Sequence, residues 1–442
     1  MPLTILSDQN VKSLLHSLSR QDILDLQLSL ADALHYYSTA TETESGCCAT
    51  YQPQRIHLKR KDGSTTLFMP ASSNEGLGVK IVTLPTVSGN KPSDMTESMS
   101  SMSLASGGSS VASKNLSSPR GSLTLLDTDG FPRGLINAEE ITAFRTALAS
   151  TMLFKKRKNV HDLTIFGAGK QAYWHARLAL LLRPDEIHHL NIINRSFETG
   201  RNLIKQLFDP ENNKEHAVHR PDVKIITPAH TEYERLLKST VRASSAIFLT
   251  TPSVEPLFPA GYLTNTEGRK KGRYIAAIGS YKPHMIEIHP DIIRQAVAPQ
   301  HHGRHFHKHA KNGGAVIVDS VESCMREAGE IVQAGLEGDQ VVELGELIML
   351  RRDAEARQRG VAASSTSSLG ADSGVQITDD DKCPGGVTGG SLDEGDLGLR
   401  DWLEKGNVIY KSVGLGLMDV VVGADLVTLA DSKGVGTRVD DF

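Results

Sequence analysis

The amino-acid sequence predicts an α/β protein in which a Rossmann-type, doubly wound parallel sheet is combined with a discontinuous α+β domain. An apolar run at 163–166 leads directly into Gly167-Ala168-Gly169, and a helix-like stretch follows at 170–182. Apolar runs then alternate with helix-like segments, a pattern typical of a parallel sheet with helices on both faces. The runs lie at 190–193, 223–226, 246–249, 274–278 and 315–319, and the helix-like segments at 198–207, 231–238 and 291–297.

The turn between the first strand and its helix has the pattern G-x-G-x-x-A, from Gly167 to Ala172. Gly167 permits a tight turn, and Gly169 has no Cβ, so a pyrophosphate can approach the backbone. Ala172 allows the helix to pack closely on the strand, and the free N–H groups of the helix face the phosphates. This context favours a dinucleotide site over the alternative, a βαβ unit whose glycines only form a tight turn.

The end of the second strand indicates which dinucleotide is preferred. Asn194-Arg195-Ser196 occupies the place, roughly 20 residues downstream, where a ribose-reading residue is expected. An acid there would bind the ribose 2′-hydroxyl and repel a 2′-phosphate. Arg195 can instead pair with a phosphate, and Asn194 and Ser196 can hydrogen-bond it. We therefore expect NADP(H) as the preferred cofactor, with NAD(H) as the alternative.

The composition of the 442-residue chain excludes several functions. A net charge of −4 and a pI near 6.5 give no basic footprint for nucleic acid. The N-terminus lacks a signal-peptide pattern, and no apolar run reaches the roughly 18 residues of a membrane-spanning helix, so we expect a cytoplasmic protein without membrane contact. The four cysteines form no C-x-x-C pair, and the histidine-rich stretch at 300–312 favours an exposed loop over a metal site, so no metal is expected.

The residues before the dinucleotide turn predict the first part of a second domain. Leucines at helical spacing over 8–37 predict a pair of amphipathic helices. Alternating apolar residues over 54–84, with an Asp-Gly turn, predict a hairpin and a third strand. The Ser-rich stretch at 86–121 lacks periodicity and predicts a disordered insertion. A strand at 123–127 follows, and then a helix that ends near Phe154. The basic run at 155–158 is expected to be a solvated helix end.

The segments after the parallel sheet predict that the second domain is completed near the C-terminus. Residues 322–336 predict one helix, 360–398 a second disordered insertion, and 408–414 a return to ordered structure. The predicted division is a substrate and dimerisation domain over 1–127, a dinucleotide domain over 128–320, and a return to the first domain over 321–442.

Three isolated cations precede the dinucleotide turn: Arg55, Lys80 and Arg145. Arg145 lies on the flank of a helix that carries an apolar stripe. A buried cation needs a partner because an unpaired buried charge is costly, and a substrate carboxylate held bidentately would be one. From the spacing alone, an internal salt bridge or a cation that reaches solvent is the more frequent outcome.

Six short motifs follow one another along the chain. They are Phe68-Met69-Pro70-Ala71, Gly78-Val79-Lys80, Phe144-Arg145-Thr146-Ala147, the run from Ile165 to Ala172, Glu327-Ala328-Gly329-Glu330 and Tyr410-Lys411-Ser412-Val413-Gly414. In this order they resemble the ornithine cyclodeaminase/mu-crystallin family. The likeness covers nearly all of the chain outside the Ser-rich, His-rich and 360–398 segments.

The resemblance implies a homodimer whose subunits each combine a dimerising substrate domain with a nicotinamide-binding domain. It implies that Arg55 and Arg145 clamp the carboxylate of a small amino or imino acid. Lys80 would then act on the reacting imine or amine as proton donor and electrostatic stabiliser. The positions that match cofactor-lining residues of the family are Thr146, Lys170, Gln171, Thr251 and Val413, with Ser117 as a further candidate in the first insertion.

The likeness departs from the cyclodeaminases of the family at Tyr281. Those enzymes carry an aspartate shortly after the strand that ends here in Gly279-Ser280, whereas reductases similar to mu-crystallin lack it. A tyrosine, with a pKa of about 10, cannot act as a carboxylate base or pair with an ω-ammonium group, and Glu287 is the alternative source of a carboxylate.

We therefore expect an NAD(P)H-dependent oxidoreductase that reduces a C=N bond next to a carboxylate. The first alternative is a cyclodeaminase that converts ornithine to proline. The second is a protein that binds NADPH without catalysis.

Overall fold

The computed structural model describes residues 2–39, 48–50, 52–84, 120–298, 314–348 and 403–442. The predicted insertion at 360–398, the histidine-rich stretch at 300–312 and Ser117 lie outside these ranges. So does the predicted insertion at 86–121, except for its last two residues. Arg120 and Gly121 begin a strand, because their backbone pairs with Thr83 and Val82.

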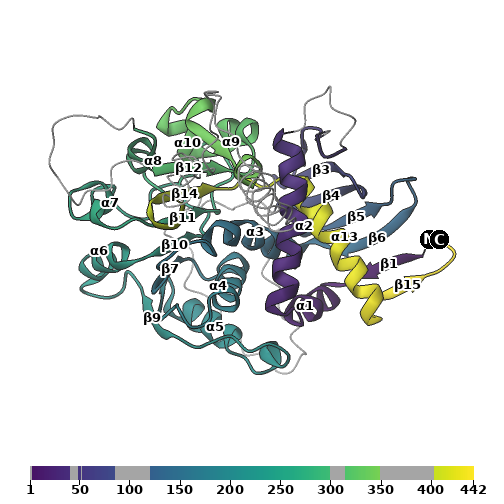
Figure 1. The fold of residues 1–442 in the computed structure, drawn as a ribbon, viewed down its shortest axis with the longest axis horizontal. Helices are drawn as coiled ribbons and strands as arrows, with labels where there is room; N and C mark the ends of the chain where they lie inside the picture. The colour runs from purple at the N-terminus through teal and green to yellow at the C-terminus, as the bar shows by residue number, and fades with distance from the viewer. Residues whose placement is uncertain (1, 40–47, 51, 85–119, 299–313, 349–402) are drawn as a thin grey trace, which may run out of the picture.

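An eight-stranded parallel sheet forms the larger half of the molecule (Figure 1). Its strand order is β13-β12-β14-β11-β10-β7-β8-β9, and every neighbouring pair is parallel. The strands are β7 (Asp162–Phe166), β8 (His189–Ile193), β9 (Asp222–Ile226), β10 (Ala246–Leu249), β11 (Tyr274–Ala277), β12 (Gly314–Val318), β13 (Val341–Glu343) and β14 (Asn407–Lys411). The predicted fold class is confirmed, and each strand predicted for this sheet is displaced by no more than a residue.

Helices cover both faces of the parallel sheet, and its strands β10 and β11 are accordingly apolar at every position. In β10, Ala246 and Phe248 pack into one buried cluster with α3, α4 and α5. Ile247 and Leu249 pack into the other cluster, with α6 to α10. The helices are α3 (Ala138–Phe154), α4 (Lys170–Leu182), α5 (Phe197–Leu207), α6 (Tyr233–Ala243), α7 (Gly261–Thr264), α8 (Pro290–Val297), α9 (Val321–Glu327) and α10 (Gly329–Ala334).

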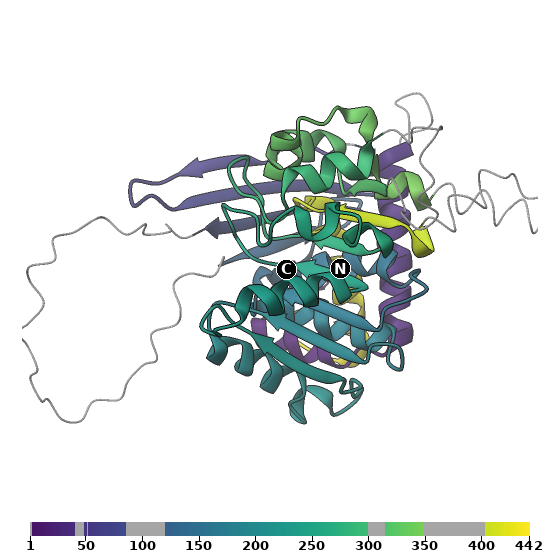
Figure 2. The ribbon, with the colours of Figure 1, turned by 90° about the vertical axis from the view of Figure 1, so that its left-hand side faces the viewer.

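The second sheet has seven strands in the order β15-β1-β6-β5-β4-β3-β2, antiparallel except for the β1–β6 pair. Its strands β3 and β4 extend well beyond the helices (Figure 2). Helices α1 and α2, the predicted amphipathic pair, and α13 pack with this sheet in the same buried cluster as α3. The elements are β1 (Leu3–Leu6), β2 (Ile56–Lys59), β3 (Thr65–Ser73), β4 (Gly76–Leu84), β5 (Arg120–Leu126), β6 (Pro132–Asn137), β15 (Thr437–Val439), α1 (Asp8–His16), α2 (Arg20–Thr39) and α13 (Gly416–Lys433).

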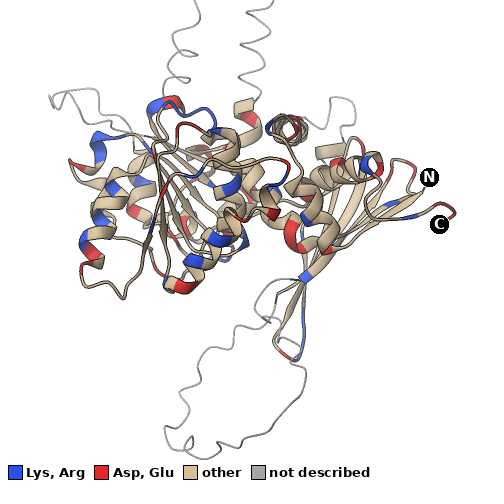
Figure 3. Ribbon diagram, turned by 90° about the horizontal axis from the view of Figure 1, so that it is seen from below, with Lys and Arg blue, Asp and Glu red and all other residues tan. Residues whose placement is uncertain are grey.

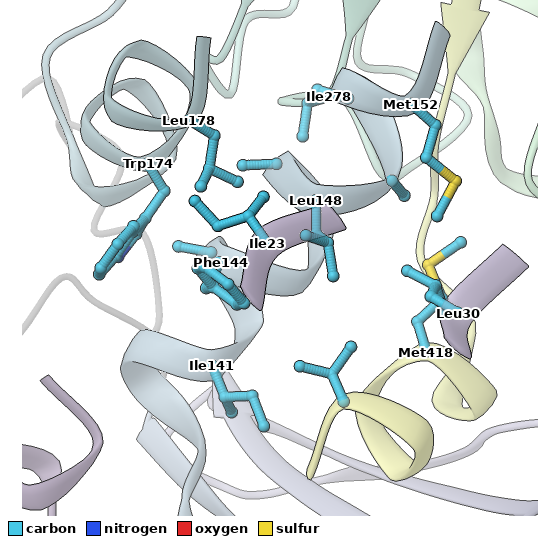
Figure 4. Close-up of a cluster of buried hydrophobic side chains, with 14 of the residues drawn as sticks. Ile23, Leu30, Ile141, Phe144, Leu148, Met152, Trp174, Leu178, Ile278 and Met418 are labelled. Carbon is cyan, nitrogen blue, oxygen red and sulfur yellow. The ribbon is translucent and has the colours of Figure 1, made fainter. Parts of the chain in front are cut away.

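Helix α3 joins the two sheets in one continuous core (Figure 4). Phe144 of α3 meets the ring of Trp174 from α4 edge-on, with centroids 5.3 Å apart. The α3 side chains Phe144 and Leu148 share the cluster with Leu30 of α2 and Met418 of α13. The two sheets are therefore held together by packed apolar side chains from elements far apart in sequence.

The predicted domain boundaries at 127 and 320 do not follow the two sheets. Strand β6 lies after residue 127 but belongs to the seven-stranded sheet, and β14 lies after residue 320 but pairs with β11 and β12 in the parallel sheet. Val408, Ile409 and Tyr410 of β14 are at most 2% exposed, as a central strand requires. We propose that the domains be divided by sheet, with β14 in the dinucleotide domain.

Two local predictions are corrected. The helix predicted at 322–336 is split into α9 and α10, because the backbone of Ala328 is extended. At this break the chain packs closely on the loop at Met285, whose carbonyl oxygen would lie 2.0 Å from a Cβ on Gly329. The basic run after α3 is not wholly solvated. Arg157 is 3% exposed and donates to the carbonyls of Leu403 and Gly406. In the described ranges, no helix is long and apolar enough to cross a membrane.

Candidate active site

The dinucleotide turn lies where the strand order of the parallel sheet reverses, with β8 on one side of β7 and β10 on the other. Gly167 has φ +105°, and a Cβ there would come within 2.8 Å of the Thr250 hydroxyl, so glycine is required. A Cβ on Gly169 would meet nothing within 4 Å, and α4 begins there without a side-chain cap. The open backbone and the uncapped helix end fit a pyrophosphate.

Two of the predicted cofactor residues on α4 differ in their surroundings. Lys170 turns to α3, where its Nζ is 3.0 Å from Glu139 Oε2 and 2.6 Å from Glu140 Oε1. Gln171 has a buried Oε1 without a hydrogen-bond partner among the described residues. Thr146 of α3 donates to the carbonyl of Thr142 at 2.8 Å. Gln171 therefore offers an unused polar atom beside the turn, whereas Lys170 connects the turn to α3.

The segment after β8 presents one free cation. Asn194 donates to the carbonyl of Ser196 at 2.8 Å, and the Ser196 hydroxyl caps α5 by accepting from the Thr199 N–H. Arg195 is exposed, and no hydrogen bond or ion pair with another described residue engages its guanidinium. Its charge is available to an anion beside the turn.

Two of the predicted catalytic cations share one buried carboxylate, Asp419 of α13. Its Oδ1 is 2.8 Å from Lys80 Nζ and 3.2 Å from Arg145 Nε. All three side chains are at most 5% exposed. Burial lowers the pKa of Lys80 to about 8; the Asp419 charge opposes this, while Arg145 and Arg55 add to it. Asp419 Oδ2 is buried without a partner among the described residues.

Gly414, in the turn after β14, lies between Arg145 and the third predicted cation, Arg55. Arg55 Nη2 donates to the Gly414 carbonyl at 3.1 Å, and its Nη1 is 3.3 Å from Glu327 of α9. Gly414 has φ +88°, and a Cβ there would lie 2.7 Å from Arg145 Nη2. The missing side chain therefore lets the Arg145 guanidinium approach the same residue whose carbonyl Arg55 binds.

A cavity of about 560 Å³ opens between the two sheets at this point. Its wall includes Arg55, Glu327, Gly414 and Tyr281, and Met69 of β3 is the register partner of Lys80. Lys80 and Arg145 thus lie directly behind the wall. Burial raises the pKa of Tyr281 above its usual range, so this side chain is a neutral hydroxyl at neutral pH.

Buried carboxylates hold the loops at the carboxyl edge of the sheet. Glu287 accepts the backbone N–H groups of Thr251 and Gly279, both at 2.6 Å. Asp319, at the end of β12, accepts the N–H groups of Val413, at 3.3 Å, and Gly414, at 2.7 Å. The predicted cofactor residues Thr251 and Val413 are therefore fixed through their main chain. The Thr251 hydroxyl also donates to Glu287 Oε1 at 3.3 Å, and Val413 packs against the apolar cluster below the loops.

The sequence missed Asp419, Glu327 and Gly414 as members of this site. Asp419 did carry a signal, since it and Asp425 are the two acids within the mostly apolar stretch at 413–426. Such an acid must be paired when the stretch is buried. Among the described residues, no group of three His, Cys, Asp or Glu side chains is arranged to hold a metal ion. The geometry suits an organic anion held by guanidinium groups, with an ammonium group nearby.

Comparison with protein-family models matches residues 17–344 to the ornithine cyclodeaminase/mu-crystallin family. Delta(1)-pyrroline-2-carboxylate reductase of Bacillus cereus is 24% identical over 91% of this chain and 94% of its own. Ketimine reductase mu-crystallin of mouse is 24% identical over 56% of this chain and 64% of its own.

Among solved structures, Delta(1)-pyrroline-2-carboxylate reductase of Thermococcus litoralis, in complex with NADH and L-proline, matches with a TM-score of 0.59. It is 18% identical, and the match covers 99% of this chain and 100% of that one. This likeness shows a shared fold.

Replacing Gly414 tests whether its missing side chain matters to the two arginines. We expect Gly414→Ala to lose about 1–2 kcal/mol of stability from the left-handed backbone and a further 1–3 kcal/mol, approximately, from the contact with Arg145. The matched control is Gly434→Ala, at φ +63° with nothing within 4 Å of an added Cβ, which should lose the first amount alone. Chemical denaturation of both variants measures the difference, and equal losses would contradict the close approach.

Proposed function

The chain belongs to the ornithine cyclodeaminase/mu-crystallin family, and on that premise we propose that it is a nicotinamide-dependent reductase of small imino acids. The reaction is reduction of a C=N bond next to a carboxylate. The observation that carries the proposal is that Arg55 lines the cavity while Lys80 and Arg145 meet at Asp419 directly behind its wall, at the same edge of the parallel sheet as the dinucleotide turn. Ligands of doubly wound sheets bind at this edge.

Arg55 and Arg145 bind the substrate carboxylate. The terminal nitrogens of Arg145 are close to the position of a Gly414 Cβ, while its Nε is occupied by Asp419. A planar guanidinium held through Nε keeps its orientation and can present its outer nitrogens to a carboxylate. Two such groups on either side of one glycine fix the acid end of the substrate.

Lys80 donates a proton to the imine nitrogen. Its ammonium group is buried and paired with Asp419, and a pKa of about 8 keeps it mostly protonated at neutral pH yet weakly acidic enough to transfer the proton. The dinucleotide turn at Gly167 and Gly169 would hold a nicotinamide cofactor, whose chemistry would be the supply of a hydride to the imine carbon. The proton and the hydride together convert C=N to CH–NH.

Tyr281 favours the reductase over the cyclodeaminase. A cyclodeaminase must hold and deprotonate an ω-ammonium group, which requires a carboxylate near the far end of the substrate. Tyr281 is on the cavity wall, neutral and partly buried. Glu287 is fully buried and engaged by two backbone N–H groups, so it is not positioned to replace the missing acid.

A substrate screen separates the candidate functions. Purified protein is given NADPH or NADH with a panel of cyclic ketimine carboxylates, and cofactor absorbance is followed. We expect oxidation of NADPH by these imines and little or no proline from ornithine with NAD⁺. Robust formation of proline and ammonia from ornithine, lost in Tyr281→Phe, would favour the cyclodeaminase. Tight NADPH binding without turnover of any imine would favour the non-catalytic alternative.

NADP(H) is the preferred cofactor in this proposal, because Arg195 is exposed and the segment 194–196 contains no acid. We expect Arg195→Asp to weaken NADPH binding by about tenfold to a hundredfold, because a charge-assisted hydrogen bond to the 2′-phosphate is lost. NADH has no such phosphate, so its binding should change far less. Arg201→Asp, an exposed charge reversal on α5, the helix that follows Arg195, is the control. Fluorescence titration measures both dinucleotides, and equal binding of NADH and NADPH by the wild type would overturn the preference.

The proton donor gives the reaction a pH dependence. Lys80 loses its proton as the pH rises through about 8, so kcat/KM should fall on the alkaline side of that value. In Asp419→Asn the charge that raises the Lys80 pKa is removed, so the fall should move to lower pH by about one unit. A profile flat across this range in the wild type would remove Lys80 from the role.

A homodimer is supported by the outer face of the seven-stranded sheet, the face turned away from α13. Leu77 and Leu135 are 39% and 38% exposed there, and Val79, Ile81 and Leu126 share the face. Charged residues are sparse along these strands (Figure 3). An apolar sheet face of this kind is buried by a second subunit in many dimers.

The dimer proposal predicts that Leu77→Arg combined with Leu135→Arg yields a monomer at concentrations where the wild type is dimeric. Each substitution places a charge in the proposed apolar contact, where it would be desolvated. Leu28→Arg, at a 59% exposed leucine of α2, is the matched control and should stay dimeric. Analytical ultracentrifugation distinguishes the two, and a dimeric double variant would assign the interface to another surface.

A further inference from the structure

Glu287 is a fully buried acid that the proposed reaction does not use. It follows the loop after β11, and its two oxygens accept the N–H groups of Thr251 and Gly279. Thr251 follows β10, and Gly279 follows β11. One side chain thus ties together the carboxyl ends of two neighbouring strands.

The two tied loops are in direct contact with each other and with the dinucleotide turn. A Cβ on Gly279 would come within 2.2 Å of the Thr251 carbonyl oxygen, so the two backbones touch. A Cβ on Gly167 would lie 3.0 Å from Thr251 Cγ2. Thr251 therefore lies between the turn and the loop that leads to Tyr281 in the cavity wall.

The sheet order indicates which part of a dinucleotide would lie over this place. The pyrophosphate belongs at the start of α4, and the adenosine ribose belongs at the end of β8, on one side of β7. The other half must extend over β10, β11 and β14, on the opposite side. The nicotinamide ring would then lie beside Thr251, in front of Glu287.

The charge around Glu287 is negative in sum. The charged groups that face it are Lys411 of β14 and Glu330 of α10. Lys411 Nζ is 3.2 Å from Glu330 Oε2 and donates to the Ser280 carbonyl, while Glu330 Oε1 accepts the backbone N–H of Glu287 at 2.9 Å. Two carboxylates thus share one ammonium group. Because Lys411 is paired with Glu330, the charge of Glu287 has no cation of its own among the groups that face it.

We infer that Glu287 is a positioning residue for the nicotinamide half of the cofactor site, and that its buried charge makes the oxidised cofactor bind more tightly relative to the reduced one. The oxidised nicotinamide ring carries one positive charge and the reduced ring carries none. A buried anion behind the ring therefore stabilises the oxidised form selectively. The inference rests on the proposed cofactor. It goes beyond that proposal because it names the residue that sets the relative affinity for the oxidised and the reduced cofactor.

The test measures dissociation constants for NADP⁺ and NADPH at about pH 8.5, where Glu287 is ionised. Glu287→Gln removes the charge and keeps the size. We expect the ratio of the NADP⁺ constant to the NADPH constant to rise about fivefold, as for a unit charge acting through roughly 8 Å of partly hydrated protein. A residue that only held the loops would weaken both forms equally and leave this ratio unchanged, which would overturn the inference.

Two further variants separate charge from shape. Glu287→Asp keeps the charge but shortens the side chain, so both affinities should fall while the ratio stays at the wild-type value. Asp425→Asn removes a partly buried carboxylate of α13, beside the other sheet, and should alter neither constant. Failure of the wild type to bind either dinucleotide would reject the proposed function itself, whereas binding with an unchanged ratio in Glu287→Gln rejects the inference alone.

A pH titration of the wild type keeps the test decisive if Glu287→Gln does not fold. Burial raises the pKa of Glu287 to about 7, so the charge is present above that pH and lost as the pH falls through it. The NADP⁺ to NADPH ratio should therefore rise as the pH is lowered to about 6. Lys80 loses its proton at higher pH than Glu287, so the ratio is measured between about pH 7.5 and 6. The same measurement on Glu287→Asp, which keeps the charge, serves as the comparison. A wild-type ratio that stays constant over this range contradicts the inference.

Discussion

A single buried carboxylate, Asp419, is the constraint on which the arrangement of the candidate site depends. It brings an ammonium group from β4 and a guanidinium group from α3 to one oxygen on α13. Charges this deeply buried are tolerated only as a paired group, so each of the three side chains requires the other two. The position of the substrate cations is thereby tied to the packing of α13 against both α3 and the seven-stranded sheet.

The same logic extends to the loops of the parallel sheet. Its carboxyl edge is made of short turns whose backbone N–H groups have no partner within the sheet. The carboxylates of Glu287 and Asp319 accept hydrogen bonds from these N–H groups. A turn held through its main chain keeps its shape without using its outward side chains. Glycine at 279 and 414 then brings neighbouring groups closer than any side chain would allow.

The sequence was informative where structure is set by local pattern. The strands β7 to β12 of the parallel sheet and the dinucleotide turn depend on residues a few positions apart, and they were predicted within a residue. The ion pairs of the site were not. Asp419 is 339 residues from Lys80 and 274 from Arg145, and no local signal states which charges will meet. The segment of β14 was grouped with the second domain although it pairs with β11 and β12, because an apolar run indicates that a strand is buried but not which strands lie beside it.

The position of β14 also has a consequence for the order in which the molecule can form. This strand lies between β11 and β12, although it is separated from β12 by nearly 90 residues of sequence. While the chain is being synthesised, β11 and β12 emerge long before the strand that must join them. The middle of the sheet stays open until residues 407–411 have left the ribosome, and Gly414, which both arginines approach, follows only then. Assembly of the site is therefore a late, non-local event, and pairing of this kind is slow and exposes apolar strand edges in the meantime.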